Sequence, residues 1–110
     1  MKRAVTFLIF AMGLLTQSAW AADAAAGKAA YNTCIACHGA KGEGNKALNA
    51  PPLAGLQDWY VARQLQNYKS GVRGADPKDT FGAQMRPMSM TLADDQAIKD
   101  VSAYIATLGK

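Results

Sequence analysis

Apolar residues recur at helical spacing in two segments of the chain. Val61, Leu65 and Tyr68 lie about one turn apart, which predicts a helix over residues 58–70 with Gly71 at its end. A longer apolar stripe predicts a last helix over residues 94–108. This stripe consists of Ala97, Ile98, Val101, Tyr104, Ile105 and Leu108. Each predicted helix would bury one face, so the pattern indicates a core built from helices.

An alanine-rich segment at residues 23–33 precedes these two helices. Alanine is the strongest helix former, and Asp23 can cap a helix that continues into the residues beyond Thr33. Gly27 and Tyr31 lie one turn apart on the same side of this helix. A glycine there lets another helix approach closely. We expect the apolar stripe of the last helix to be that partner.

Two other segments contain several glycines and little periodicity. Residues 39–49 are polar and include Gly39, Gly42 and Gly44, which is typical of turns. Residues 71–90 contain three glycines and two prolines, and we expect them to form one long loop. Loops of this length usually have a function.

The first 21 residues have the pattern of a secretory signal peptide. Lys2 and Arg3 supply positive charge, residues 4–15 are mostly apolar, and Ala19-Trp20-Ala21 has the small-x-small pattern of a cleavage site. The apolar run is shorter than the ~20 residues needed to cross a bilayer. We therefore expect cleavage after Ala21 and a single domain over residues 22–110. Retention of the leader as an uncleaved anchor is the alternative.

Processing changes the charge of the protein. The whole chain has a net charge of +4, and the leader contains Lys2 and Arg3 but no acidic residue, so the remaining side chains carry +2. This small excess does not indicate binding to nucleic acid. We also expect no stable membrane insertion once the leader is removed.

The most informative motif is Cys34-Ile35-Ala36-Cys37-His38, which is typical of covalent haem attachment. Each thiol can add across one vinyl group of the porphyrin, and the adjacent histidine then lies under the iron as its proximal ligand. These two cysteines and this histidine are the only ones in the chain. A short chain buries a limited core, and a bound apolar macrocycle would complete it.

Three other chemistries use closely spaced cysteines, and each fits this sequence less well. A structural zinc site usually has about four Cys or His ligands, whereas this cluster offers three. A thioredoxin-like redox pair lies between strands, and nothing around Cys34 has a strand pattern. A disulfide between Cys34 and Cys37 would close a very small loop and add little stability.

Two further features suit an iron ligated by His38. Met85, Met88 and Met90 lie within six residues, and a methionine thioether can occupy the sixth iron position and raise the reduction potential. Methionine also fills gaps in cores, so any one of the three can instead serve packing. The carbonyl of Pro51 is a candidate acceptor for the second imidazole N–H of His38, although this proline can also serve only as a turn.

Together these features resemble the class I c-type cytochromes, specifically the small bacterial monohaem domains. The residues that carry the resemblance are Gly27, Cys34-Ile35-Ala36-Cys37-His38, Pro51-Pro52-Leu53-Ala54-Gly55, residues 60–71 and Tyr104-Ile105. The resemblance covers residues 22–110 and implies an all-α class I cytochrome c fold. In that fold, three to four helices wrap around one covalently attached haem.

The resemblance also implies particular ligands. In similar domains the axial methionine lies seven residues before the apolar residue that precedes the last helix, which is Leu92 here, so the ligand would be Met85. The proximal-loop pattern Pro-x-Leu-Ala-Gly begins at Pro51, which places Pro51 and Leu53 beside the haem. The resemblance therefore implies one haem c attached through its two cysteines, with His38 and Met85 on the iron.

An iron with both axial positions filled has no open site for substrate, so the expected function is one-electron transfer rather than enzymatic catalysis. We expect a periplasmic carrier that takes electrons from a quinol-oxidising complex or a dehydrogenase and passes them to a terminal oxidase or reductase. Export agrees with the resemblance, which implies haem attachment outside the cytoplasm. The alternatives are a haem enzyme or gas-binding protein with an open distal position, and a subunit of a larger redox complex.

Overall fold

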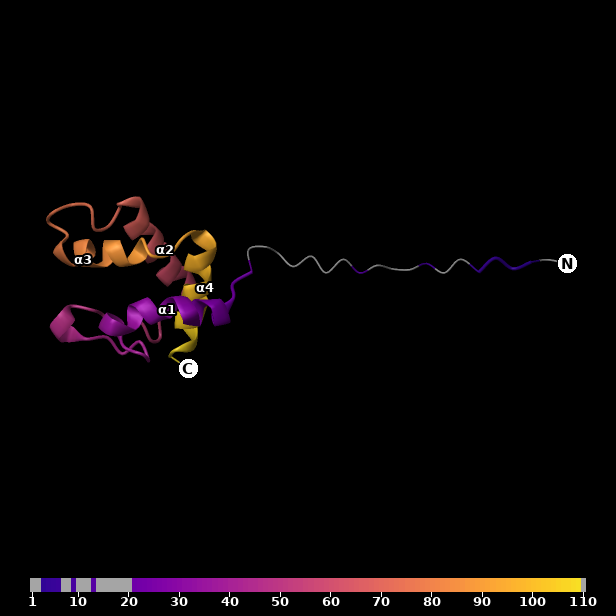
Figure 1. The fold of residues 1–110 in the computed structure, drawn as a ribbon, viewed down its shortest axis with the longest axis horizontal. Helices are drawn as coiled ribbons and strands as arrows, with labels where there is room; N and C mark the ends of the chain where they lie inside the picture. Colours follow the sequence, from indigo (N-terminus) through magenta and orange to yellow (C-terminus); the bar gives the residue numbers. More distant parts are fainter. Residues whose placement is uncertain (1–2, 7–8, 10–12, 14–20, 110) are drawn as a thin grey trace.

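The computed structural model describes residues 3–6, 9, 13 and 21–109. Within these residues the fold is all-α, as predicted, and one isolated bridge joins Asn45 to Ala50. The elements are α1 (Ala24–His38), η1 (Lys46–Leu48), α2 (Asp58–Ser70), α3 (Thr80–Ser89) and α4 (Asp95–Thr107) (Figure 1). Most of the predicted leader lies outside the described residues.

Helix α1 begins at Ala24, just after Asp23, and continues through the whole cysteine motif, as the alanine-rich sequence predicted. The Asp23 carboxylate caps the helix by accepting hydrogen bonds from the backbone N–H groups of Ala25 and Ala26. The helix ends at His38 because Gly39 adopts a φ of 86°, a conformation that glycine tolerates better than other residues. The motif therefore occupies the last turn of a regular helix.

Helices α1 and α4 cross in contact, which confirms the predicted pairing (Figure 1). At Gly27 an added Cβ would lie 2.9 Å from the backbone nitrogen of Val101 and closer still to the carbonyl oxygen of Asp100. One turn further on, the rings of Tyr31 and Tyr104 have centroids 5.3 Å apart. The crossing is thus a backbone-to-backbone approach that requires glycine.

The apolar core lies among α1, α2, α4 and the segment before α4. Its buried members are Tyr31, Val61, Leu65, Leu92, Ile98, Val101 and Ile105. Three half-buried residues with predicted site roles pack against this same cluster, namely Cys34, Leu53 and Met85. The candidate site therefore borders the core.

The prediction of one long loop over residues 71–90 was wrong, because residues 80–89 form α3. Gly82 and Pro87 lie inside this helix, and both residues disfavour helix in isolation. Asp79 compensates by capping the first turn through a hydrogen bond from the Gly82 N–H. Packing of α3 against α2 supplies tertiary contacts that the local sequence does not reveal.

Candidate functional site

The last turn of α1 brings Cys34, Cys37 and His38 together. Both thiols are free, with Cys34 half-buried and Cys37 exposed. Burial raises the pKa of the Cys34 thiol, and the neighbouring Cys37 raises it further. Thiol–disulfide catalysts instead lower the pKa of their reactive cysteine. The arrangement therefore does not favour redox catalysis by this thiol pair.

His38 is held in one orientation by the proximal loop. Its side chain is buried, and Nδ1 lies 2.8 Å from the carbonyl oxygen of Pro51. A carbonyl can only accept, so Nδ1 donates the proton of this bond and Nε2 is the ring nitrogen left for a ligand. The predicted Pro51 acceptor is thus confirmed as a contact. Metal-bound histidines are usually oriented in this way, with the second ring N–H donated to a carbonyl or carboxylate.

The loop after α1 folds tightly enough to deliver the Pro51 carbonyl to His38. The Gly44 N–H donates to the His38 carbonyl at 2.7 Å, and two hydrogen bonds of 2.8 and 3.0 Å pair Asn45 with Ala50. Gly44 has a φ of 79°, and a Cβ there would lie 2.6 Å from the backbone nitrogen of Pro52. The glycines that predicted a turn are therefore needed for this close return of the chain.

The Tyr31 hydroxyl closes the start of this loop and was not recognised from the sequence. It donates to the Gly39 carbonyl at 2.6 Å, just beyond His38. Burial, followed by the electrostatic effect of Cys34, raises the pKa of Tyr31 to about 12. The hydroxyl is therefore protonated at neutral pH and remains a donor. Its position two turns before His38 was the available signal, since that places both on one face of α1.

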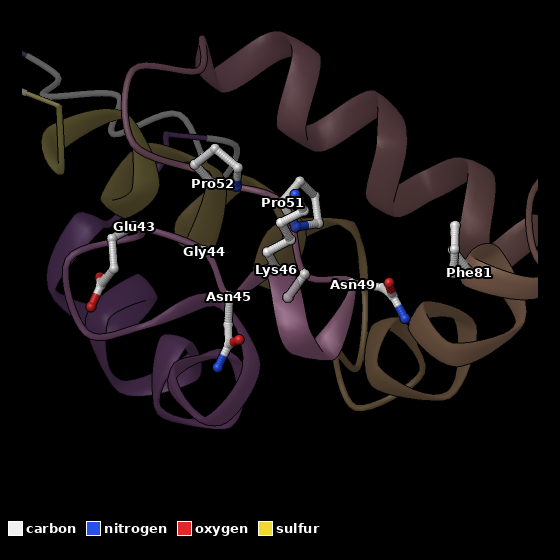
Figure 2. A pocket seen from close by; sticks show the side chains of 9 residues that line it. Glu43, Gly44, Asn45, Lys46, Asn49, Pro51, Pro52 and Phe81 are labelled. Carbon is white, nitrogen blue, oxygen red and sulfur yellow. The ribbon is translucent and has the colours of Figure 1, made fainter.

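A cavity of about 400 Å³ opens between the proximal loop and the first turn of α3 (Figure 2). Its lining residues are Glu43, Gly44, Asn45, Lys46, Asn49, Ala50, Pro51, Pro52 and Phe81. Figure 2 shows Phe81 on α3, on the opposite side of this space from Glu43 and Asn45. Ile35, Phe81 and Met88 also leave large apolar surfaces exposed on α1 and α3. Of these three residues, only Phe81 lines the cavity. Pro51 is the one predicted site residue in its lining, which does not include Cys34, Cys37, His38 or Met85.

The structure distinguishes the three clustered methionines. Met85 is half-buried and packs against the core, whereas Met88 and Met90 are 41% and 47% exposed. Leu53 also packs against the core, next to the loop that carries Pro51. Met85 is therefore the methionine of the three that lies inward.

Comparison with known proteins gives the family. The sequence model of the cytochrome c family matches residues 24–109, which span all the helices of the structure. The chain belongs to the cytochrome c family. It has the features of a class I c-type cytochrome with a small monohaem domain.

Several known proteins are similar to this chain. Cytochrome c4 of Azotobacter vinelandii is 33% identical over 109 residues, which cover 97% of this chain and 51% of that protein. Cytochrome c-554(548) of Halomonas halodenitrificans is 37% identical over 87 residues, covering 79% of this chain and 98% of that protein. The thiosulfate dehydrogenase electron acceptor of Stutzerimonas stutzeri is 39% identical over 77 residues, or 70% of this chain and 33% of that protein. This cytochrome spans about half the length of the cytochrome c4 relatives.

Membership of this family means that the protein carries one haem c, attached covalently through Cys34 and Cys37. The residues present fit this group: two free thiols lie one helical turn apart, and the adjacent imidazole keeps Nε2 free of the loop. The chain is thus a haem-binding domain of the cytochrome c family. In the part of the chain that the structure describes, no helix has the length and apolar character required to span a membrane.

Proposed function

We propose that this cytochrome is an exported one-electron carrier whose haem iron is ligated by His38 and Met85. The hydrogen bond of 2.8 Å between His38 Nδ1 and the Pro51 carbonyl carries the proposal. It fixes the tautomer and the plane of the ring before any ligand is bound. When bound, haem c supplies an iron that cycles between ferric and ferrous states.

His38 and its loop set the proximal side. The hydrogen bond from Nδ1–H to the Pro51 carbonyl makes Nε2 a better electron donor and prevents rotation of the imidazole. The hydrogen bonds between Asn45 and Ala50 hold the loop closed behind this contact. Because the ring is already in place, a change of iron charge needs little rearrangement, which suits rapid electron transfer.

Met85 would set the distal side. A thioether is a neutral, soft ligand that favours ferrous iron and so raises the reduction potential. Met85 reaches inward from α3 and packs on the core, while Met88 and Met90 face solvent. With Met85 on the iron, no open position is left for a substrate, and the protein acts as a carrier rather than an enzyme.

The ligation is tested by replacing each methionine in turn in the haem-loaded protein. Met85→Ala should abolish the weak far-red ferric absorption band that methionine ligation produces and should let cyanide bind rapidly. Met88→Ala and Met90→Ala are matched controls from the same segment and should retain the band. Loss of the band in Met88→Ala alone would show that the distal ligand has been misassigned. Rapid cyanide binding by the unmodified protein would instead support a haem enzyme or gas-binding protein.

The proposed location is the periplasm, with cleavage after Ala21 and a functional domain over residues 22–110. Ala21 and Ala22 are exposed and precede the Asp23 cap, so the proposed scissile bond lies outside α1. The proposed donor is a quinol-oxidising complex or a dehydrogenase, and the proposed acceptor is a terminal oxidase or reductase. The name of one relative, a thiosulfate dehydrogenase electron acceptor, supports a dehydrogenase as donor. The mass of the haem protein in a periplasmic extract tests the location and cleavage.

A further inference from the structure

Helix α3, which carries Met85, is fixed to α2 by a group of polar contacts. These contacts involve the end of α2, the loop over residues 71–79 and the first turns of α3. They have no part in the proximal loop described above. Because α3 carries Met85, these contacts also determine where Met85 lies relative to His38 and the cysteines.

The Asp79 carboxylate is the centre of this group. Arg73 donates to it twice, from Nε to Oδ2 at 3.0 Å and from Nη2 to Oδ1 at 3.3 Å. Two backbone N–H groups also donate to it, that of Gly74 at 2.9 Å and that of Gly82 at 3.1 Å. One side chain therefore joins the loop after α2 to the first turn of α3. We call Arg73 and Asp79 together the α3 clamp.

The clamp has little room to adopt another arrangement. A Cβ at Gly74 would lie 2.8 Å from the Cβ of Arg86 and would also meet the carbonyl of Gly82. A Cβ at Gly82 would meet the Asp79 carboxylate itself. The loop and helix are thus packed backbone against backbone, and a carboxylate with four donors fits the space between them.

Residues at the end of α2 also contact the Arg73 guanidinium of the clamp and a side chain from the middle of α3. The Arg73 guanidinium lies 5.1 Å from the ring centroid of Tyr68. The backbone N–H of Arg73 donates to the Asn67 carbonyl at 3.0 Å. Arg86, the neighbour of Met85, donates from Nε to the Tyr68 carbonyl at 3.2 Å. These contacts hold α3 in position against α2, and α2 is itself part of the core.

We propose that Asp79 is a positioning residue that, through Arg73, sets where α3 lies and so holds Met85 in place as the distal ligand. The inference rests on the proposed His38/Met85 ligation. Phe81, two residues after Asp79, lines the cavity that Pro51 also lines. Met85 lies six residues beyond Asp79, or about 9 Å along a helix. A shift of the clamped end therefore moves both the cavity wall and the methionine.

The experiment uses the haem-loaded protein and the substitution Asp79→Asn, which removes the charge but keeps one oxygen acceptor. We expect a weakened far-red ferric band and a cyanide-binding rate raised roughly 1.4- to fivefold, the range expected for a partly exposed ion pair. Asp76→Asn is the matched control, because its carboxylate lies in the same loop and accepts from the Lys78 N–H instead. It should leave both readouts unchanged.

A second variant covers the case in which Asp79→Asn does not fold. Arg73→Gln leaves the two backbone donors of Asp79 in place and should show the same spectral change, whereas Arg73→Lys should restore most of the band. If the unmodified protein shows the band and Arg73→Gln matches it, with Asp79→Asn also matching it where that variant folds, the clamp has no positioning role. If the unmodified protein lacks the band, the ligation itself is wrong, and the assignment of Asp79 fails with it.

Discussion

The crossing of α1 and α4 should fail if Gly27 gains a single methyl group. In the substitution Gly27→Ala, the new Cβ would lie 2.9 Å from the backbone nitrogen of Val101 and closer to the Asp100 carbonyl. Ordinary contacts between heavy atoms are about 3.5–4.0 Å, so the helices must separate by about 1 Å or more. Backbone atoms cannot rotate away as a side chain would.

The magnitude follows from two opposing effects. Overpacking typically costs about 1–3 kcal/mol, and a clash with backbone belongs at or above the upper end of that range. Alanine gains about 1 kcal/mol over glycine through helix propensity. The net loss of unfolding free energy is therefore about 2 kcal/mol. In a domain of this size that corresponds to a fall in Tm of roughly 8–16 °C.

The assay is thermal unfolding of the haem-loaded protein, followed by far-UV circular dichroism. Ala29→Gly is the control, since Ala29 is exposed on the same helix and its loss should cost only the propensity difference of about 1 kcal/mol. Helix propensity alone predicts that Gly27→Ala is stabilising. A Tm equal to or above that of the unmodified protein would therefore refute the reasoning from the crossing.

Two further predictions concern side chains beside the site. Tyr31→Phe removes the hydroxyl that donates to the Gly39 carbonyl and should lower the unfolding free energy by about 1–2 kcal/mol in denaturant titration; an unchanged value would mean that the bond adds no stability. Hydrogen bonds from Arg73, then from Gly74, lower the pKa of Asp79 from 3.8 to about 2. Asp79 therefore stabilises the fold above about pH 4, and this contribution is lost as the pH falls towards 2. The Tm of Asp79→Asn should vary less than that of the unmodified protein over this interval, and parallel curves would contradict the role of the carboxylate.

Much of the fold was predictable because the helices that form the core have strong local signals. Asp23 and the alanines specify the start of α1, and the periodic apolar residues of α2 and α4 specify their buried faces. Gly27 predicted a close helix crossing because glycine has no Cβ and lets another backbone approach. The cysteine motif predicted the haem independently of any of these elements, since its chemistry depends on local spacing alone.

Helix α3 was not predictable in the same way. Gly82 and Pro87 argue against a helix locally, and the residues that stabilise it lie in other parts of the chain, as with Arg73 and the Tyr68 carbonyl. Asp79 before Thr80 is a capping signal, but the position of its carboxylate also depends on the guanidinium of Arg73, six residues earlier. The choice among the three methionines likewise depends on which one the tertiary structure turns inward. The formation of α3 and the orientation of Met85 thus depend on tertiary packing rather than on local sequence.

The contact between the two ends of the domain has a consequence for the order of folding. The Asp23 N–H donates to the Asp100 carboxylate across 77 residues of chain, close to the place where Gly27 meets α4. Closing so long a loop is entropically costly, and it cannot occur until the last helix has been synthesised. Before that, α1 has no partner for its buried face, and its two thiols remain accessible. The topology therefore leaves an interval in which a newly synthesised chain can stay extended and receive its haem before the core closes.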